Sequence, residues 1–431
     1  MNSPTLDLPA RLLGSRAEPA ADLAGHLARH GALDVPRGHP GAWSRSVLEA
    51  VEAAGLRGRG GGGFPSARKW DTVRRASRRP LVVVNAMEGE PASAKDRVLL
   101  VHAPHLVLDG ADVAAAAVGA SEIVVCVADD RPAVATAVEV AVSERRRAGM
   151  SGPRITVQRP PGRYVTGEES ALVGWLDRKL ALPVFRPDKS RPLTVGRRPT
   201  LVHNAETLAQ VALIARHGPE WFRRQGTPEA PGSTLVTVTG AVRSPGVLEV
   251  EFGVPVVDIL RRAGVDAPLS AVLVGGYGGA WLDGAHLSTP YAPGPLAAAG
   301  VDLGVGVLVA LADRSCGIAE TARLSRYLAA ESAGQCGPCV FGLPAIADDL
   351  ERLAAGRADV GVLARIDRRA GEVVGRGACR HPDGAARLVR SALAVFGADA
   401  RRHAEGRPCA GHTAPSVLTL PRPPADRRGV R

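Results

Sequence analysis

The stretch that decides the fold, residues 58–70, reads Gly58-Arg59-Gly60-Gly61-Gly62-Gly63-Phe64-Pro65-Ser66-Ala67-Arg68-Lys69-Trp70. Five of its first six residues are glycine, which leaves a turn of bare backbone whose N–H groups can gather around an anion. A helix that follows such a turn adds the positive end of its dipole, which suits a phosphate. Glycine-rich turns that bind no ligand also exist, so the turn alone does not establish a phosphate site. Lys69 favours a phosphate, because a compact ammonium stands there in a chain whose cations are nearly all arginine.

The composition indicates a globular protein with several domains. A chain of 431 residues suggests roughly two to four domains. Apolar residues make up 45% and aromatics only 3%, so small aliphatic side chains must fill the cores. Neither an apolar run of membrane-spanning length nor a secretory signal is visible, so we expect a cytoplasmic protein. The net charge of +11 comes from scattered arginines without interleaved aromatics, and nucleic acid is therefore not an expected partner.

An α/β domain follows the glycine turn. Residues 81–85 and 123–127 are continuous apolar runs of the kind that form buried parallel strands, and residues 104–119 between them are alanine-rich and helical. A further strand is expected at 155–157. Alternating strands and helices predict a parallel sheet whose ligand-binding loops gather at the carboxyl ends of the strands. We expect a helical lead-in over 1–50 and this α/β domain over 51–228.

The second half of the chain changes character after a Pro- and Gly-containing linker at 227–232. Short alternating segments and turns over 234–305 predict a small β-rich domain. Beyond residue 310 the pattern becomes helical, and we expect a bundle over 310–405. The tail, 406–431, is rich in Pro and Arg and is predicted to be disordered. The expected helices of the bundle lie near 318–331, 340–354, 361–372 and 384–397.

The cysteines are too few and too unevenly spaced for a disulfide framework, and Cys126 fits a strand core. Cys336-Gly337-Pro338-Cys339 can present two thiolates to one metal, and Cys379 adds a third. Three interpretations stay open: an iron–sulfur cluster with an unidentified fourth ligand, a structural zinc site completed by His381, or a metal-free redox or disulfide pair.

Several motifs together resemble one family, the flavin-carrying, NADH-oxidising subunit of respiratory complex I and its relatives in NAD-linked hydrogenases and formate dehydrogenases. The resemblance runs from about residue 50 to about residue 400. It implies an α/β FMN-binding domain, a β-grasp-like soluble-ligand-binding domain and a helical bundle with a [4Fe–4S] cluster. The motifs are Gly55-Leu56-Arg57 followed by the glycine turn, Glu88-Gly89-Glu90-Pro91, Lys95-Asp96-Arg97, Gly167-Glu168-Glu169-Ser170-Ala171-Leu172 and Asn204-Ala205-Glu206-Thr207-Leu208.

The resemblance implies a set of binding residues and no catalytic acid or base. The glycine turn and Lys69 would cradle the FMN phosphate and the nucleotide, Asn85 and Glu88 would face the flavin, and Glu90 would contact the nicotinamide nucleotide. Gly167, Glu168 and Glu169 would form a second wall, although two acids at a helix start can also simply complement its dipole. The cofactor-binding set is Gly58, Arg59, Gly60, Gly61, Gly63, Phe64, Lys69, Asn85, Glu88, Glu90, Tyr164, Gly167, Glu168, Glu169, His203, Asn204 and Thr207; the cluster set is Cys336, Cys339 and Cys379.

The chain departs from the family at several positions. Met87 replaces an acid, His203 an asparagine, and Thr72 and Lys189 stand for aromatic residues that help to hold the nucleotide. We therefore expect weaker or altered nucleotide binding. Ala333 occupies the place of the first cluster cysteine. Cys316 and Cys409 are candidate replacements; Cys316 is expected at the far end of the helix that ends near Ala333, whereas Cys409 could fold back from the tail.

The expected activity is that of an FMN-dependent NADH dehydrogenase module, with FMN, NADH and a [4Fe–4S] cluster. The resemblance implies two electron-accepting partners, a thioredoxin-like [2Fe–2S] subunit and a larger iron–sulfur subunit. Through them the chain would lie at the inner face of the membrane without inserting into it. Two alternatives remain: a paralogue that uses another donor or acceptor in a non-respiratory reductase, and a non-catalytic module whose sites have decayed.

Overall fold

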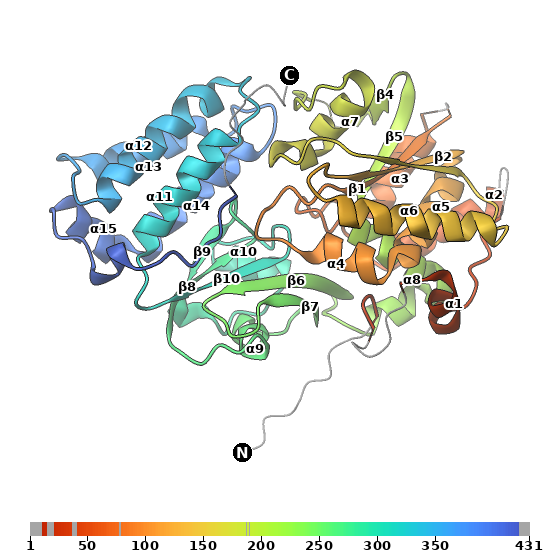
Figure 1. Cartoon of the computed structure of the whole chain (residues 1–431), viewed down its shortest axis with the longest axis horizontal. Coiled ribbons are helices and arrows are strands. Elements are labelled where there is room, and N and C mark those ends of the chain that lie inside the picture. The colour runs from red at the N-terminus through yellow and green to blue at the C-terminus, as the bar shows by residue number, and fades with distance from the viewer. Residues whose placement is uncertain are drawn as a thin grey trace, which may run out of the picture.

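The computed structural model describes residues 11–14, 21–36, 41–76, 79–186, 188 and 190–421. The expected lead-in and tail therefore lie partly outside the described residues, and Lys189 lies wholly outside them. In Figure 1 the first sheet and its helices form the right-hand part, a helical bundle forms the left-hand part, and a second sheet lies below and between them.

The first sheet has five strands in the order β3-β2-β1-β5-β4. All neighbours are parallel except β4, which runs antiparallel to β5, so the predicted parallel sheet is confirmed. The register pairs Asn85 with both Cys126 and Asn204, which places the two asparagines side by side at the carboxyl ends of β1 and β5. The strands are β1 (Leu81–Ala86), β2 (Glu122–Val127), β3 (Arg154–Gln158), β4 (Leu193–Val195) and β5 (Arg198–Asn204).

Helices cover both faces of this sheet because its strands are apolar on both sides. Val82 and Val84 pack with α2, α3, α5 and α8, whereas Leu81, Val83 and Cys126 pack with α7 on the other face. None of the described helices alone is long and apolar enough to cross a membrane; α4 and α5 pass that test only as a bent pair, and α5 is almost wholly buried. The helices are α1 (Leu23–His30), α2 (Gly41–Ala53), α3 (Ser66–Arg74), α4 (Lys95–His102), α5 (Pro104–Val118), α6 (Pro132–Arg147), η1 (Val165–Gly167), α7 (Glu169–Arg178) and α8 (Ala205–Arg223).

The second sheet is mixed, in the order β7-β6-β10-β8-β9, with β6 and β10 parallel at its centre. One face packs on α9 and α10, and the other packs on the bundle through Tyr277 and Trp281. This arrangement agrees with the expected β-grasp-like domain. Its elements are β6 (Ser233–Gly240), β7 (Gly246–Glu251), α9 (Val256–Arg262), β8 (Leu269–Val274), β9 (Ala280–Asp283), η2 (Gly284–His286), α10 (Pro293–Ala298) and β10 (Val307–Ala312).

The bundle contains the four predicted helices, each within a few residues of its expected position, and a further helix, α15. The turn that carries Cys339 is a short π-helix, η3, which leads directly into α12. Such local widening of a helix is frequent at functional sites. The elements are α11 (Gly317–Ala330), η3 (Pro338–Gly342), α12 (Leu343–Ala354), α13 (Val362–Val373), α14 (His381–Val395), α15 (Gly397–Ala404) and η4 (Ala410–Thr413).

The predicted disorder of the tail is wrong for residues 406–421, which pack against the bundle. Cys409 and Leu418 are buried. The Glu320 carboxylate on α11 accepts hydrogen bonds from Ser416 Oγ at 2.8 Å and from the Val417 amide at 2.9 Å. These contacts with a distant helix outweigh the local effect of a Pro- and Arg-rich composition. Residues 422–431 lie outside the described part of the chain.

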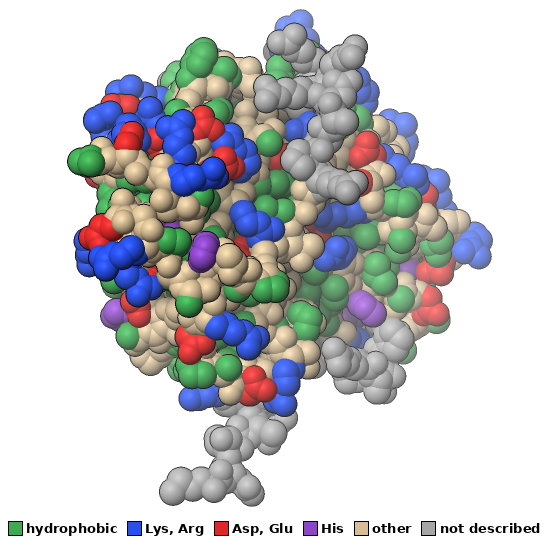
Figure 2. Space-filling model, turned by 60° about the vertical axis from the view of Figure 1, so that its left-hand side comes forward, with side chains coloured by type: hydrophobic (Ala, Val, Ile, Leu, Met, Phe, Trp, Pro, Cys, Tyr) green, Lys and Arg blue, Asp and Glu red, His purple; other side chains and the backbone are tan. Residues whose placement is uncertain are grey.

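Basic side chains are spread over the surface. On the face shown in Figure 2, Lys and Arg are interspersed with acidic, apolar and other residues. Several arginines link neighbouring helices: Arg326 on α11 contacts Glu351 on α12 at 2.7 Å, and Arg390 on α14 contacts Asp367 on α13 at 3.1 Å. Exposed pairs of this kind each stabilise a fold by about 1 kcal/mol or less.

Candidate flavin and cluster sites

A cavity of about 290 Å³ lies where the α/β domain, the second sheet and the bundle meet. The predicted residues Gly60, Gly61, Asn85, Glu88, Glu90, Tyr164, Gly167, Glu168, Asn204 and Cys379 all line it. The lining does not include Gly58, Arg59, Gly63, Phe64, Lys69, Glu169, His203 or Thr207. The structure thus brings together ten of the predicted residues from both halves of the chain.

The glycine turn is held by its flanking residues. The Gly58 amide donates to the Phe64 carbonyl at 2.9 Å and closes the turn, in which Gly61 has a φ of 99° that only glycine adopts easily. The Arg59 amide donates to Thr207 Oγ1 at 2.9 Å, and its buried guanidinium donates to the Ser233 carbonyl at 3.3 Å. Arg59 and Thr207 therefore position the turn from behind rather than lining the cavity.

Glu88 has a strained backbone at the end of β1. Its φ is 45°, a left-handed conformation that is uncommon for a residue with a side chain and that clusters at functional sites. Its carboxylate accepts hydrogen bonds from Ser93 Oγ at 2.8 Å and from the Asp96 amide at 2.9 Å, and it pairs with Arg131 at 2.8 Å. These contacts fix the loop that precedes α4.

Lys95 is the buried cation among the residues that line the cavity, which also include Arg380 and Arg387. Its ammonium contacts Asp96 at 2.8 Å, Glu206 at 3.0 Å and Asn204 Oδ1 at 3.0 Å. Burial alone would lower the pKa of Lys95, but the two carboxylates outweigh it and raise that pKa, so the ammonium stays charged. Burial raises the pKa of Asp96 to about 6 against the opposing effect of Lys95. The lysine predicted for this role, Lys69, instead pairs with Glu169 at 2.8 Å and donates to the Val202 carbonyl at 2.7 Å.

His203 does not face the cavity. Successive residues of a strand point to opposite faces, so Asn204 lines the cavity while His203 points toward α3. There the His203 ring accepts a hydrogen bond from Trp70 Nε1 at 2.8 Å, and burial holds the pKa of His203 well below its usual range. The structure therefore gives His203 a core position, in contrast to the binding role that the resemblance implies.

Glu90 is a buried carboxyl group shared by three parts of the fold. It accepts hydrogen bonds from the Tyr277 amide at 2.9 Å, the Ala92 amide at 3.2 Å and the Tyr164 hydroxyl at 3.3 Å. Burial raises the pKa of Glu90 to about 7, although these hydrogen bonds oppose that effect. The close approach requires a glycine opposite, since a Cβ on Gly276 would lie 2.5 Å from Glu90 Oε2.

The neighbouring residues Glu168 and Glu169 have different partners. Glu168 caps α7, where its carboxylate accepts hydrogen bonds from the amides of Ser170 at 3.0 Å and Ala171 at 2.9 Å. Glu169 pairs with Lys69 instead. Glu168 therefore acts as the N-cap of α7 in this structure, and this residue also lines the large cavity.

The three predicted cluster cysteines share a second, small cavity. Cys336, Cys339 and Cys379 line it together with Ala333 and His381. The Ala378 amide donates to Cys336 Sγ at 3.4 Å, which ties the loop before α14 to the loop before η3. Burial raises the pKa of Cys339 to about 12 and that of Cys379 to about 11, so these sulfur atoms become thiolates only when a cation joins them.

His381 has a free nitrogen in this region. Its Nε2 donates to the Leu328 carbonyl at 2.8 Å, because a carbonyl can only accept. The buried Nδ1 then carries a lone pair, and within the described residues it has no hydrogen-bond partner. His381 lines both the large cavity and the cysteine cavity, so it stands between them.

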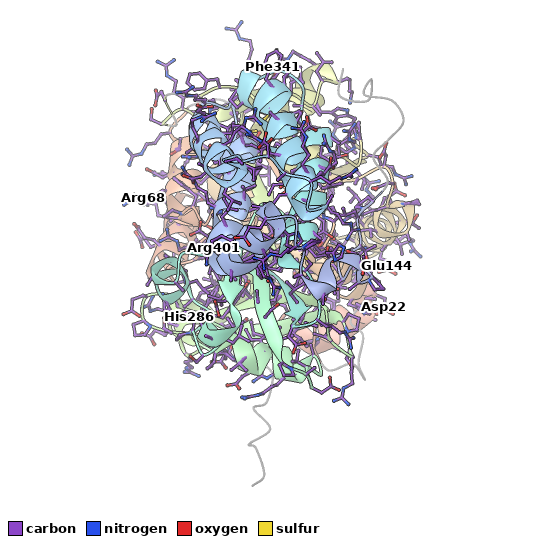
Figure 3. All side chains as sticks on the ribbon, turned by 90° about the vertical axis from the view of Figure 1, so that its left-hand side faces the viewer. Asp22, Arg68, Glu144, His286, Phe341 and Arg401 are labelled. Carbon is purple, nitrogen blue, oxygen red and sulfur yellow. The ribbon has the colours of Figure 1, made fainter. Side chains whose placement is uncertain are left out.

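Neither candidate replacement for the missing cysteine reaches this cavity. Cys316 begins α11 and Cys409 precedes η4, and the two lie with His403, all three ligand atoms within 4.8 Å of one another. Cys316 therefore lies away from Ala333 as expected, whereas the hypothesis that Cys409 folds back to the cluster is wrong. Figure 3 shows Phe341, two residues from Cys339, at one end of the bundle and Arg401, two residues from His403, well away from it.

Sequence reasoning missed part of the lining. Lys95 and Asp96 belong to a quoted motif, and their place before a helix could have marked them. The Gly-Gly-Tyr-Gly-Gly turn that follows β8 is recognisable in the sequence, but nothing local indicates that it faces the first domain. The further lining residues are Gly89, Ser93, Lys95, Asp96, Val165, Gly275, Gly278, Gly304, Val305, Arg380, His381, Gly384 and Arg387.

Three segments match known protein families. Residues 51–213 match the Nuo51 FMN-binding domain, residues 235–264 match the SLBB domain, and residues 319–403 match the NADH-ubiquinone oxidoreductase-F iron-sulfur binding region. Among solved structures, the chain is similar to a chain of NAD+-reducing [NiFe]-hydrogenase in the H2-reduced state, with a TM-score of 0.77 and 33% identity. The match covers 85% of this chain and 63% of the hydrogenase chain, less than two thirds of its length.

Named relatives agree with these matches. The chain is 33% identical over 380 residues to an F subunit (F 2) of NADH-quinone oxidoreductase in Rhizobium meliloti (strain 1021), and the match covers 85% of this chain and 90% of the relative. It is 32% identical over 399 residues to the NADH-quinone oxidoreductase F subunit of Streptomyces coelicolor, with 88% and 89% covered. The resemblance carried by the motifs is confirmed, and the chain belongs to the family of NADH-quinone oxidoreductase F subunits.

Proposed function

We propose that this chain is the NADH-oxidising flavoprotein module of a larger electron-transfer enzyme, with FMN in the large cavity and a [4Fe–4S] cluster at the three cysteines. Held there, FMN would supply the chemistry that links hydride transfer from NADH to single-electron transfer toward the cluster. The observation that carries the proposal is the shared lining: one cavity includes Gly60, Asn85 and Asn204 of the flavin domain as well as Cys379 of the cluster loop.

The lining fits a flavin mononucleotide. The backbone of Gly60 and Gly61 and the start of α8 at Asn204 provide donors for a phosphate, whereas the three ammonium hydrogens of Lys95 are taken by Asp96, Glu206 and Asn204. Asn85 is fixed by a hydrogen bond from its Nδ2 to the Gly167 carbonyl at 2.9 Å, and together with Glu88 it would face the flavin ring, as the resemblance implies. Lys69 stays part of the proposed phosphate site, although its ammonium contacts Glu169 here.

The two cavities adjoin through aromatic side chains. Tyr164 and His381 line the large cavity, and their ring centroids lie 5.4 Å apart. His381 also lines the cysteine cavity, where its free Nδ1 offers the fourth protein donor that Ala333 cannot supply. We assign the cluster ligands to Cys336, Cys339, Cys379 and His381.

The activity is tested by anaerobic purification followed by absorbance spectra before and after addition of NADH. We expect flavin bands that bleach with NADH and a broad iron–sulfur shoulder. Flavin that stays oxidised would favour the paralogue with another donor, and a colourless protein would favour the non-catalytic module. Glu90→Gln is expected to weaken NADH binding, and exposed Glu220→Gln on α8 serves as the control.

The fourth ligand is tested by replacing His381. We expect His381→Ala to lose one iron per cluster, seen as a three-iron signal in paramagnetic resonance, and His381→Cys to restore a four-iron cluster. His286→Ala is the matched control, because His286 is exposed on the second domain (Figure 3). An unchanged spectrum in His381→Ala would overturn the assignment while leaving the flavin proposal intact.

The relatives are named as subunits, so we infer that this chain works within a complex. The proposed partners are a thioredoxin-like [2Fe–2S] subunit and a larger iron–sulfur subunit, through which the chain would lie at the inner face of the membrane. Phe341, 75% exposed, and Val340 stand beside Cys339 and offer an apolar contact for an acceptor close to the cluster. We place the domain boundaries at 51–228, 234–305 and 310–405.

A further inference from the structure

A second group of soft ligands lies in the bundle, separate from the cluster cysteines. Cys316 Sγ, His403 Nε2 and Cys409 Sγ lie within 4.8 Å of one another, and all three residues are buried. Cys316 Sγ is 3.6 Å from the His403 ring. A tetrahedral zinc ion sets neighbouring sulfur and nitrogen ligands roughly 3.5–3.8 Å apart, so this group needs little rearrangement to hold one.

The hydrogen bonds of His403 fix its tautomer. Its Nδ1 lies 3.1 Å from the carbonyl oxygens of both Leu353 and Ala354, so Nδ1 carries the proton. The lone pair is then on Nε2, which faces the two sulfur atoms. Metal-binding histidines are commonly oriented by such a bond from the other ring nitrogen to a carbonyl. At present the Cys409 amide donates to Nε2 at 3.1 Å, and a metal would take the place of that hydrogen bond.

We propose that Cys316, His403 and Cys409 bind a structural Zn²⁺ ion. Two thiolates and one imidazole are ligands that zinc prefers. The segment Cys409-Ala410-Gly411-His412 carries a second imidazole three residues after Cys409. The ring centroids of His412 and His403 lie 6.4 Å apart, and His412 Nδ1 donates to the Cys409 carbonyl at 2.8 Å, which leaves the lone pair on Nε2. His412 is exposed and lies outside the group of ligand atoms within 4.8 Å of one another, so its ring would have to turn toward the site to serve as the fourth ligand.

The ion would join the start of α11 to a part of the chain about ninety residues later, the end of α15 and the C-terminal segment 406–421 that directly follows it. That segment continues to Thr419, whose carbonyl accepts a hydrogen bond from the Tyr277 hydroxyl at 2.8 Å. The Tyr277 amide in turn binds Glu90 in the large cavity. The zinc site would thus fasten a segment that supports one wall of the flavin cavity.

The test is metal analysis of the full chain, purified with zinc supplied and with its flavin and cluster retained. We expect one zinc per chain in addition to the cluster iron. Cys409→Ser and His403→Gln should lower zinc at least tenfold while iron and flavin per chain stay unchanged. Cys126→Ala is the control, because Cys126 is buried in β2 outside both sites. Wild-type protein without zinc, or variants that keep it, would overturn the proposal.

A second measurement uses only wild-type protein, so it does not depend on the variants folding. A zinc-selective chelator should remove the ion and speed proteolysis within residues 406–421, and added Zn²⁺ should reverse both effects. Cleavage that is insensitive to the chelator contradicts the proposal. Mass spectrometry without reductant tests the same point. A disulfide between Cys316 and Cys409 in the purified protein would contradict the proposed zinc site, because the two thiolates would no longer be free to bind the ion.

Discussion

At the scale of single residues, the cavity depends on glycines that leave room for a buried acid. Gly276 has a φ of 100°, and a Cβ there would meet the Glu90 carboxylate. We predict that Gly276→Ala lowers the free energy of unfolding by about 1–2 kcal/mol for the backbone strain alone and also weakens FMN binding by displacing Glu90. Thermal unfolding and flavin titration measure the two effects. Gly294→Ala on α10 is the control, because a Cβ on Gly294 meets nothing within 4 Å and α10 lies in the second domain.

Glu90 should also make stability depend on pH. Burial raises its pKa from 4.5 to about 7 in the folded chain. Between these values the unfolded chain has lost the proton that the folded chain keeps, so stability falls as pH rises, by up to about 3 kcal/mol, and then levels off. Glu90→Gln removes this dependence. The thermal midpoint of the wild type should therefore fall relative to that of Glu90→Gln as the pH rises from about 5 to about 8. A difference between the two midpoints that stays constant with pH would contradict the prediction.

Single residues also show the limits of sequence reasoning. Asn85 was predictable because it ends an expected buried strand, whereas Asn204 was reached only through the family-like motif; the structure pairs the two residues on neighbouring parallel strands. Lys69 and Lys95 both belong to family-like motifs, and only the packing of α4 against the second sheet brings Lys95 into the lining. His203 adjoins Asn204 in sequence but faces the opposite side of β5. Which side of a strand faces a cavity depends on what covers each face.

At the scale of elements, the cavity is surrounded by the starts of helices. α4, α7 and α8 begin at Lys95, Glu169 and Ala205, next to lining residues. Among the elements of this domain, β1, β2, β3 and α5 were predicted, since apolar strand runs and an Ala-rich stretch are local signals, whereas α4, α8 and β5 were not. The C-terminal segment was not, because its order depends on Glu320, about a hundred residues earlier.

Two substitutions of Glu168, the N-cap of α7, distinguish a structural role of its carboxylate from a role in cofactor binding. Glu168→Ala removes two accepted amide hydrogen bonds and should lower stability by about 1 kcal/mol. Glu168→Ser keeps a capping oxygen but removes the carboxylate, so it should restore the thermal midpoint. We predict that Glu168→Ser also keeps wild-type FMN affinity. A restored midpoint with weakened FMN binding would instead identify Glu168 as a cofactor contact.

At the scale of the whole molecule, the flavin domain meets the second sheet and the bundle at one cavity, and buried contacts hold it there. Glu331 at the end of α11 pairs with Arg163 at 3.0 Å and accepts the Tyr164 amide at 3.0 Å, and both charged side chains are nearly inaccessible. Gln335 donates to the Pro183 carbonyl at 2.6 Å, which adds a second bond between bundle and flavin domain. The relative position of the two cofactor sites therefore depends on these polar contacts, together with the packing of Tyr164 and Ala92 against the apolar core of the bundle.

This dependence predicts how Glu331→Gln will behave. The change leaves the buried Arg163 charge without its partner, which should cost about 3 kcal/mol of stability. Because Glu331 holds Tyr164 beside His381, we expect slower reduction of the cluster by the flavin, whereas bleaching of the flavin by NADH keeps its rate. Stopped-flow absorbance resolves the two steps. Asp399→Asn removes an exposed pair with Arg402 within α15 and should change stability by less than about 1 kcal/mol and neither rate. Equal slowing of both steps in Glu331→Gln would show that the contact supports the flavin site itself rather than its alignment with the cluster.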